Sequence, residues 1–418
     1  MKVSHLAENI IGSEIIKLAG EINEKIKNGD RIFNFTIGDF DPNEFPIPDV
    51  LKQYIIEEYT NNQTNYPPGD GVLSLREAVS KLLREQGGLN YGTDEILIAG
   101  GARPIIYAIF RTLVDPGDKV IFATPSWNNN HYSYLNGAEA VIIEATPEQH
   151  FMPLAKNIHP HIQSAAMLAL CSPQNPTGTA FTKQGLEEIC QMVMAENKRR
   201  GPNAKPLYLM FDQIYWALTY GDTQHFNPVT LYPDMRPYTV FIDGISKSLA
   251  ATGVRVGWGM GPKPIIDKMK AILSHIGAWA PKAEQVATAR YLNNTKDYLA
   301  FVELQKNKVH SRLQAIYAGF EKLKTEGFAV NAIAPQAAIY LTVQFSLHGK
   351  KSKDGKVLET TADITKYLLD EAKLAIVPFY AFGSDKNSSW YRLSVGTCKL
   401  QEIDQVFEQL KAALEKLS

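Results

Sequence analysis

The sequence has little cysteine, with three residues in 418, at Cys171, Cys190 and Cys398. An odd number of cysteines without metal-ligand spacing argues against a disulfide framework, so we expect three reduced, buried thiols. His159 and His161 have no acid or cysteine near them in the sequence and form an incomplete ligand set. No metal site is therefore expected.

The sequence also lacks an excess of charge of one sign and lacks a long apolar run. The formal net charge is −1, which gives no long-range attraction to nucleic acid or to an anionic membrane. No apolar run approaches the length that spans a bilayer. Residues 1–31 place glutamates among spaced apolar residues, which favours an amphipathic helix over a signal peptide. We therefore expect a cytoplasmic protein without a nucleic-acid or membrane partner.

What the chain does have is a hydrophobic share of 45% and enough length to bury a large core. Strand-like and helix-like patterns alternate between residues 94 and 261, as expected for a mainly parallel sheet covered on both faces. Beyond this region a long polar helix is predicted from about residue 301 and a final helix from residue 399. Three short strands are predicted between them, at residues 338–345, 375–378 and 390–395. This pattern predicts a large α/β domain and a smaller α+β domain.

A lysine, Lys247, follows a predicted buried strand at residues 238–242, and Arg255 comes eight residues later, before another strand-like run. Lys247 is therefore expected on a short connection at a strand end. A lysine in a partly desolvated pocket near other cations loses its proton readily and can attack a carbonyl carbon to form a Schiff base. Arg255 could hold a phosphate beside it. For this pair alone, a solvated loop is the alternative interpretation.

Three other polar segments follow predicted strands. An apolar strand runs into the turn Asn175-Pro176-Thr177-Gly178, which leaves the Asn175 amide projecting. The strand at residues 207–211 ends on Asp212, and a buried carboxylate there needs a cationic partner. Gly101 follows the strand at residues 94–99 and precedes an apolar helix predicted to end near residue 114. Glycines at a helix start expose N–H groups, which suits a phosphate.

Ligands of parallel sheets bind beyond the carboxyl ends of the strands. Trp127, Asn175, Asp212 and Lys247 all follow predicted strands at such ends. The sequence therefore predicts that these four side chains meet at one edge of the sheet.

In their order along nearly the whole chain, these motifs resemble those of the pyridoxal-phosphate-dependent aminotransferases of fold type I, class I/II, the group that includes aspartate aminotransferase. The ordered set is Phe35-Thr36-Ile37-Gly38-Asp39, Asn65-Tyr66-Pro67-Pro68-Gly69-Asp70-Gly71, Leu75-Arg76-Glu77-Ala78-Val79, Gly101-Ala102-Arg103, Asp115-Pro116-Gly117-Asp118, Pro125-Ser126-Trp127, Asn175-Pro176-Thr177-Gly178, Asp212-Gln213-Ile214-Tyr215, Ser246-Lys247 with Arg255, and Arg392-Leu393-Ser394. Each motif alone is weak, whereas the ordered set is specific.

The resemblance implies the α/β architecture of fold type I pyridoxal-phosphate-dependent transferases. The large domain, residues 47–300, should contain a mainly parallel seven-stranded sheet. A smaller α+β domain should consist of residues 1–46 and 301–418. The family also implies a homodimer whose substrates are an amino acid and a 2-oxo acid.

The resemblance assigns roles around pyridoxal 5′-phosphate. Lys247 attaches the cofactor and, once freed by the substrate, shuttles the α-proton. Asp212 pairs with the ring nitrogen and keeps it protonated. Asn175 and Tyr215 hydrogen-bond the phenolic oxygen. Trp127 stacks on the ring, with plain core packing as the alternative.

For the cofactor phosphate, the resemblance implies Arg255 together with backbone amides of Gly101, Ala102 and Arg103 at the helix start. Relatives often carry a serine three residues before the lysine, whereas this chain has Gly244 there. Ser246 is then expected as a substitute donor.

Tyr66 resembles the tyrosine that reaches the phosphate bound by the neighbouring subunit. The substrate α-carboxylate should be held by Arg392 in a two-pronged clamp, assisted by Gly38 and Asn175. Arg103 could bind a distal carboxylate, which favours aspartate and 2-oxoglutarate as substrates. Its alternatives are pairing with the cofactor phosphate or pointing to solvent, and aromatic or neutral amino acids are the alternative donors.

Two other functions share parts of this pattern. A lyase or synthase acting at Cβ or Cγ would use the same core residues. A regulator that binds the cofactor as a signal is disfavoured, because no basic DNA-binding appendage is present and the catalytic set is complete.

Overall fold

The structure is a computed structural model and describes residues 2–10 and 14–418. The predicted N-terminal helix forms as two pieces, α1 (His5–Glu8) and α2 (Glu14–Lys27). Residues 1 and 11–13 of that prediction lie outside the described residues. In the described ranges, no helix combines the length and apolar character that crossing a bilayer requires.

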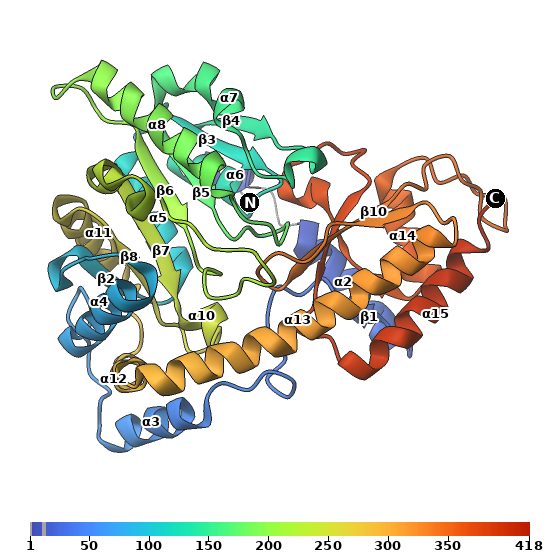
Figure 1. Ribbon diagram of the computed structural model, residues 1–418, viewed down its shortest axis with the longest axis horizontal. Helices are drawn as coiled ribbons and strands as arrows, with labels where there is room; N and C mark the ends of the chain where they lie inside the picture. The colour runs from blue at the N-terminus through green and yellow to red at the C-terminus, as the bar shows by residue number, and fades with distance from the viewer. Residues whose placement is uncertain (1, 11–13) are drawn as a thin grey trace.

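A seven-stranded sheet forms the centre of the larger part of the molecule (Figure 1). Its strands, in spatial order, are β2 (Ile96–Ala99), β8 (Gly257–Met260), β7 (Thr239–Gly244), β6 (Tyr208–Asp212), β5 (Ala165–Cys171), β3 (Lys119–Thr124) and β4 (Glu139–Glu144). Only β8 runs antiparallel to its neighbours, and the other pairs are parallel. The prediction of a mainly parallel seven-stranded sheet is therefore confirmed.

Both faces of this sheet are covered, which explains why its central strands are apolar along nearly their full length. One face packs against α5 (Ala102–Leu113) and α11 (Lys263–Ile276). The other packs against α4 (Leu73–Gly87), α8 (Lys183–Arg200) and α12 (Lys282–Asn293). The remaining helices of this part are α3 (Asp49–Thr60), α6 (Asn129–Asn136), α7 (Ala155–Ile158), α9 (Pro228–Leu231) and α10 (Ile245–Ser248).

A second core surrounds two small sheets. One is antiparallel, in the order β12 (Val377–Pro378), β13 (Trp390–Ser394), β10 (Tyr340–Phe345) and β9 (Val330–Ala332). The other pairs β1 (Phe33–Asn34) with β11 (Leu374–Ala375) in parallel. Two helices, α14 (Thr361–Glu371) and α15 (Ile403–Leu414), pack against this core.

The predicted strand at residues 375–378 is wrong as a single element. The structure divides it into β11 and β12, which belong to different sheets. Pro378 lacks a backbone N–H, and β12 lies at the edge of its sheet, where a missing donor is tolerated. The three-residue strand β9 carried too short a pattern to be predicted.

A long helix, α13 (Thr295–Thr325), connects the two cores and lies across the front of the molecule in Figure 1. It begins six residues before the predicted start because the Asn294 side chain caps it by accepting from the backbone N–H of Asp297. The predicted boundary at residue 300 therefore falls inside one continuous helix. The exact division into two domains stays a prediction.

Candidate active site

A cavity of about 630 Å³ opens beyond the carboxyl ends of β5, β6 and β7. Segments far apart in the sequence line it, including residues 36–39, the start of α5 and strands β10 and β13. The predicted site residues that line it are Gly38, Ala102, Arg103, Trp127, Asn175, Asp212, Tyr215, Ser246, Lys247, Arg255 and Arg392. Gly101 and Tyr66 are the predicted site residues that do not line it.

Lys247 lies in the one-turn helix α10, directly after β7. Its ammonium donates a hydrogen bond of 2.7 Å to the backbone oxygen of Gly38. Burial lowers the pKa of Lys247 to about 8, and the nearby negative charge of Asp39 opposes this shift. Three cavity arginines lower the pKa further, namely Arg392, Arg103 and Arg255. This amine is therefore neutral in a larger fraction of molecules at neutral pH than an ordinary lysine is.

We expect the pH dependence of chemical modification to report this shift. In the cofactor-free protein, labelling of Lys247 by an amine reagent, followed by peptide mass analysis, should reach half of its maximum near pH 8. Replacing Asp39 by asparagine should move that midpoint lower, because Asp39 stabilises the charged amine. A midpoint close to the ordinary lysine pKa would contradict the expectation.

Asp212 is the last residue of β6, at the cavity wall. Its Oδ1 accepts a hydrogen bond of 3.0 Å from the backbone N–H of Ile214, and burial raises its pKa to about 6. Within residues 2–10 and 14–418 it forms no salt bridge. A buried carboxylate without a salt-bridge partner is suited to pairing with a protonated ring nitrogen, which would supply the positive charge.

Arg392 is 2% exposed and projects from β13. Its Nη1 donates to Oδ1 of Asn175 at 3.1 Å, and its Nη2 donates to the backbone oxygen of Thr36 at 2.6 Å. Its Nε has no partner in the part of the chain that the structure describes. A buried guanidinium with a free donor beside a cavity is well placed to receive a carboxylate.

Tyr215 is buried after β6, and its hydroxyl lies 2.6 Å from that of Tyr340 in β10. Burial raises the pKa of Tyr215 well above its ordinary value and also raises the pKa of Tyr340, so both hydroxyls are neutral at neutral pH. Sequence analysis did not find Tyr340, since a tyrosine in a short apolar strand carries no signal of function.

Arg103 lies in the first turn of α5, with its guanidinium carbon 5.4 Å from the ring centre of Trp127. Arg103 is exposed and forms no salt bridge with another described residue. It lines the same cavity as Arg392. The cavity therefore has two arginines that could each bind a carboxylate.

The Arg255 side chain forms hydrogen bonds with two segments, the loop after α10 and the loop that precedes α5. Its Nη1 donates to the backbone oxygen of Thr252 at 2.8 Å, and its Nη2 donates to that of Gly100 at 2.7 Å. Gly101 has a φ of +95°, which favours glycine, and a Cβ there would clash with Nη2 of Arg255. A side chain at this position would displace the guanidinium, so glycine is required. A cation and the N-terminus of a helix thus lie together, as anion binding requires.

Gly244, where relatives often have a serine, has no room for a side chain. A Cβ there would lie 2.8 Å from the Cα of Gly257 and 2.9 Å from the backbone oxygen of Val256. Ser246 is buried and lines the cavity, so its hydroxyl is a candidate hydrogen-bond donor to the phosphate.

Tyr66 lies apart from the cavity. It is 81% exposed, and its ring packs edge-on against Trp279 with centres 5.2 Å apart. Its own chain therefore does not bring it to the site.

The structure also places Asp39 at the cavity, where it accepts a 2.6 Å hydrogen bond from the hydroxyl of Thr252. Cys190 and Cys398 are buried free thiols, and Cys171 is a partly buried free thiol at the cavity wall. Among the described residues, no three His, Cys, Asp or Glu side chains gather as a metal site would need.

Comparison with known proteins identifies the family. Residues 30–410 match the family described as aminotransferase class I and II. A probable aspartate/prephenate aminotransferase of Rickettsia prowazekii (strain Madrid E) is 29% identical over 381 residues, which cover 90% of each chain. The crystal structure of the aspartate aminotransferase from Rhizobium meliloti has a TM-score of 0.91 at 25% identity, over 100% of both chains. That of Thermus thermophilus with maleate has a TM-score of 0.87 at 25% identity, over 99% of this chain and 100% of the other. The chain belongs to the class I and II aminotransferases, and it is a pyridoxal-phosphate-dependent transaminase.

Proposed function

We propose that the enzyme transfers the amino group of an L-amino acid, with aspartate favoured, to a 2-oxo acid such as 2-oxoglutarate. The observation that carries this proposal is the position of Lys247 and Asp212 in one cavity with two arginines, Arg392 and Arg103. The two arginines match the two carboxylates of an acidic substrate. The relative from Thermus thermophilus was solved with maleate, which is also a dicarboxylate.

We propose that pyridoxal 5′-phosphate is bound in this cavity. Lys247 would hold its aldehyde carbon, Asp212 its ring nitrogen, and Asn175 with Tyr215 its phenolic oxygen. Trp127 would cover a face of the ring. The phosphate ligands would be Arg255, Ser246, the backbone of Gly101, Ala102 and Arg103, and Tyr66 of a second copy of the chain. The cofactor supplies an electron sink for the electron pair that the substrate Cα–H bond leaves behind.

The protein supplies the binding and the proton transfer. Arg392 would orient the substrate through its α-carboxylate, helped by Asn175 and the backbone of Gly38. The Nζ of Lys247 would take the proton from the substrate Cα. Its low pKa suits this step, because a base with a pKa near the working pH is neutral in a useful fraction of molecules.

The decisive experiment is a panel of amino donors tested against 2-oxoglutarate. Stoichiometric formation of glutamate would support transfer, whereas release of ammonia would indicate a lyase or synthase acting at Cβ or Cγ. Faster turnover of an aromatic or neutral donor than of aspartate would assign the enzyme to those amino acids.

Arg103 is expected to determine the preference for acidic substrates. Losing a hydrogen bond between two charged groups, worth about 1.5 to 3 kcal/mol, should lower kcat/KM for aspartate roughly 10- to 150-fold in Arg103→Ala. A neutral or aromatic donor should be affected much less. The assay needs saturating cofactor, which separates loss of cofactor from loss of substrate. Equal falls in kcat/KM for both donors would show that Arg103 does not determine the substrate preference, and would favour a role in binding the cofactor phosphate.

We also propose that the enzyme is a cytoplasmic homodimer with shared sites. Tyr66 is exposed in its own chain, as are the apolar residues Leu73, seven positions after it, and Ile276, three positions before its ring partner Trp279. A partner copy would bury these side chains and bring Tyr66 to the partner's cavity.

Mixing two subunits that are each impaired tests this arrangement. A heterodimer of Tyr66→Phe and Lys247→Ala chains contains one site with both Lys247 and Tyr66, so it should regain about half of the wild-type turnover. The measurement is activity after confirmed subunit exchange. Activity no higher than that of the two parents would show that each chain builds its own site.

A further inference from the structure

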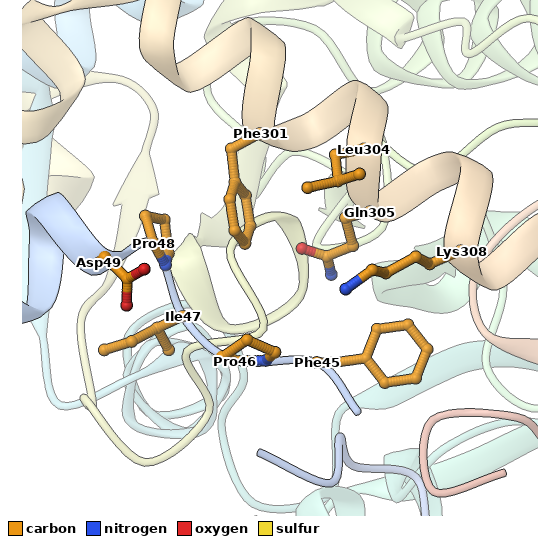
Figure 2. A pocket seen from close by; sticks show the side chains of 9 residues that line it. All are labelled: Phe45, Pro46, Ile47, Pro48, Asp49, Phe301, Leu304, Gln305 and Lys308. Atoms are coloured by element: carbon orange, nitrogen blue, oxygen red, sulfur yellow. The ribbon is translucent and has the colours of Figure 1, made fainter. Parts of the chain in front are cut away.

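A second cavity, of about 200 Å³, lies between the segment Phe45–Asp49 and the long helix α13 (Figure 2). Its lining residues are Phe45, Pro46, Ile47, Pro48, Asp49, Phe301, Leu304, Gln305 and Lys308. Most of its wall is apolar, and its volume is far above that of a single buried water.

The two segments that line this cavity each run from one hydrophobic core to the other. Phe45 belongs to the core of the small sheets, while Leu51 belongs to that of the seven-stranded sheet. On α13, Val302 packs in the core of the seven-stranded sheet and Val309 in that of the small sheets. Any change in the relative position of the two cores would therefore change the shape of this cavity.

Gln305 connects this cavity to the catalytic lysine. It is 3% exposed, and its Nε2 donates a hydrogen bond of 2.7 Å to the backbone oxygen of Lys247. Its Oε1 has no hydrogen-bond partner among the described residues. In Figure 2 this oxygen points into the space between Phe301 and Pro46. A buried acceptor without a partner favours a ligand that donates a hydrogen bond.

A positive charge lies on the same wall of the cavity as Gln305. Lys308 follows Gln305 by three positions on α13, so the two side chains are neighbours on one face of the helix, as Figure 2 shows. The Lys308 ammonium forms no salt bridge with another described residue. The acid of this cavity, Asp49, lies at the opposite end in Figure 2 and pairs with Lys52 at 3.3 Å.

We propose that this cavity binds a free apolar α-amino acid as an effector, at a site separate from the active site. The ligand ammonium would donate to Oε1 of Gln305, and its carboxylate would pair with Lys308. Its side chain would pack against Phe301 and Leu304. Because Gln305 also holds the backbone of Lys247, occupancy would change the position of the catalytic amine. The binding site does not depend on the transfer reaction proposed above.

Photolabelling can locate the ligand. The probe is L-photoleucine, a leucine analogue with a diazirine in its side chain, which is incubated with the cofactor-loaded enzyme and irradiated. We expect fragment mass spectra to place the label on residues 45–49 or 301–308 themselves, and excess L-leucine should reduce it. Lys308→Met should lower this labelling roughly three- to five-fold, as loss of a partly exposed ion pair predicts.

The matched control is Lys306→Met, which removes a lysine of the same helix that does not line the cavity. It should leave the labelling unchanged. Label confined to residues of the active-site cavity, no label at residues 45–49 and 301–308, or equal label in wild type and Lys308→Met would each overturn the proposal. Because the readout is a position of attachment and not turnover, a failure of the proposed transfer reaction would leave this test intact.

Discussion

Replacing Lys247 by alanine is expected to abolish covalent attachment of pyridoxal 5′-phosphate and to lower kcat by at least about 10⁴-fold. The variant loses both the nucleophile and the base that would take the α-proton, and proton transfer alone accounts for about 10²- to 10⁴-fold in such reactions. The burial of Lys247 and its lowered pKa are the structural reasons for assigning both roles to this amine. The measurement is borohydride reduction of the cofactor-loaded protein, followed by peptide mass mapping.

Wild-type protein should carry the reduced cofactor on the peptide that contains Lys247. A suitable control is Lys263→Ala, which removes an exposed lysine that pairs with Asp267 at 2.9 Å and does not line the cavity. This variant should keep both the label and the activity. Cofactor on any other lysine in the wild-type protein would refute the assignment of Lys247.

The strand ends that form the cavity could be predicted because their sequences have two clear parts. An apolar run long enough for a buried strand is followed by a polar residue that no core would accept. Asp212 and Lys247 both stand at such points, and the structure places both at the same cavity. The carboxyl ends of neighbouring parallel strands meet at one edge, so local patterns were sufficient here.

Contacts between distant segments could not be predicted in this way. The pairing of Tyr340 with Tyr215, and that of Thr36 with Arg392, join residues more than one hundred positions apart. The hydrogen bond from Gln305 to Lys247 depends on the course of α13 across both cores. The antiparallel direction of β8 likewise depends on its neighbours, because its own apolar run is compatible with either direction.

The structure also gives a physical reason for the glycine at position 244. The resemblance to relatives suggested that a serine is missing at Gly244 and that Ser246 replaces it. The close contacts of Gly244 with Gly257 and Val256 show that a serine would not fit in this chain without a shift of the backbone. The glycine is therefore required by the packing of β7 against β8, a reason that lies in the tertiary structure and not in the motif.

The loss of Asp212 should affect catalysis nearly as strongly as the loss of Lys247. Asp212→Asn keeps the shape of the side chain but removes its charge, so the ring nitrogen would lose the partner that keeps it protonated. We expect a fall in kcat of at least about 10³-fold, as for the loss of a preorganised charge in a desolvated site. The measurement is single-turnover kinetics with aspartate at saturating cofactor, with circular dichroism to confirm the fold.

The raised pKa of Asp212 gives this prediction a second readout. In the cofactor-free protein its carboxyl has a pKa of about 6, because burial disfavours the charged form. A cationic ring nitrogen beside it would favour the charged form, so binding the cofactor should lower this pKa and release protons near pH 6. Calorimetric titration of cofactor into the protein, in buffers of different ionisation enthalpy, measures that release. Asp212→Asn should lose this proton release while the covalent bond to Lys247 still forms. If the variant had turnover near that of wild type and unchanged proton release, Asp212 would have only a structural role.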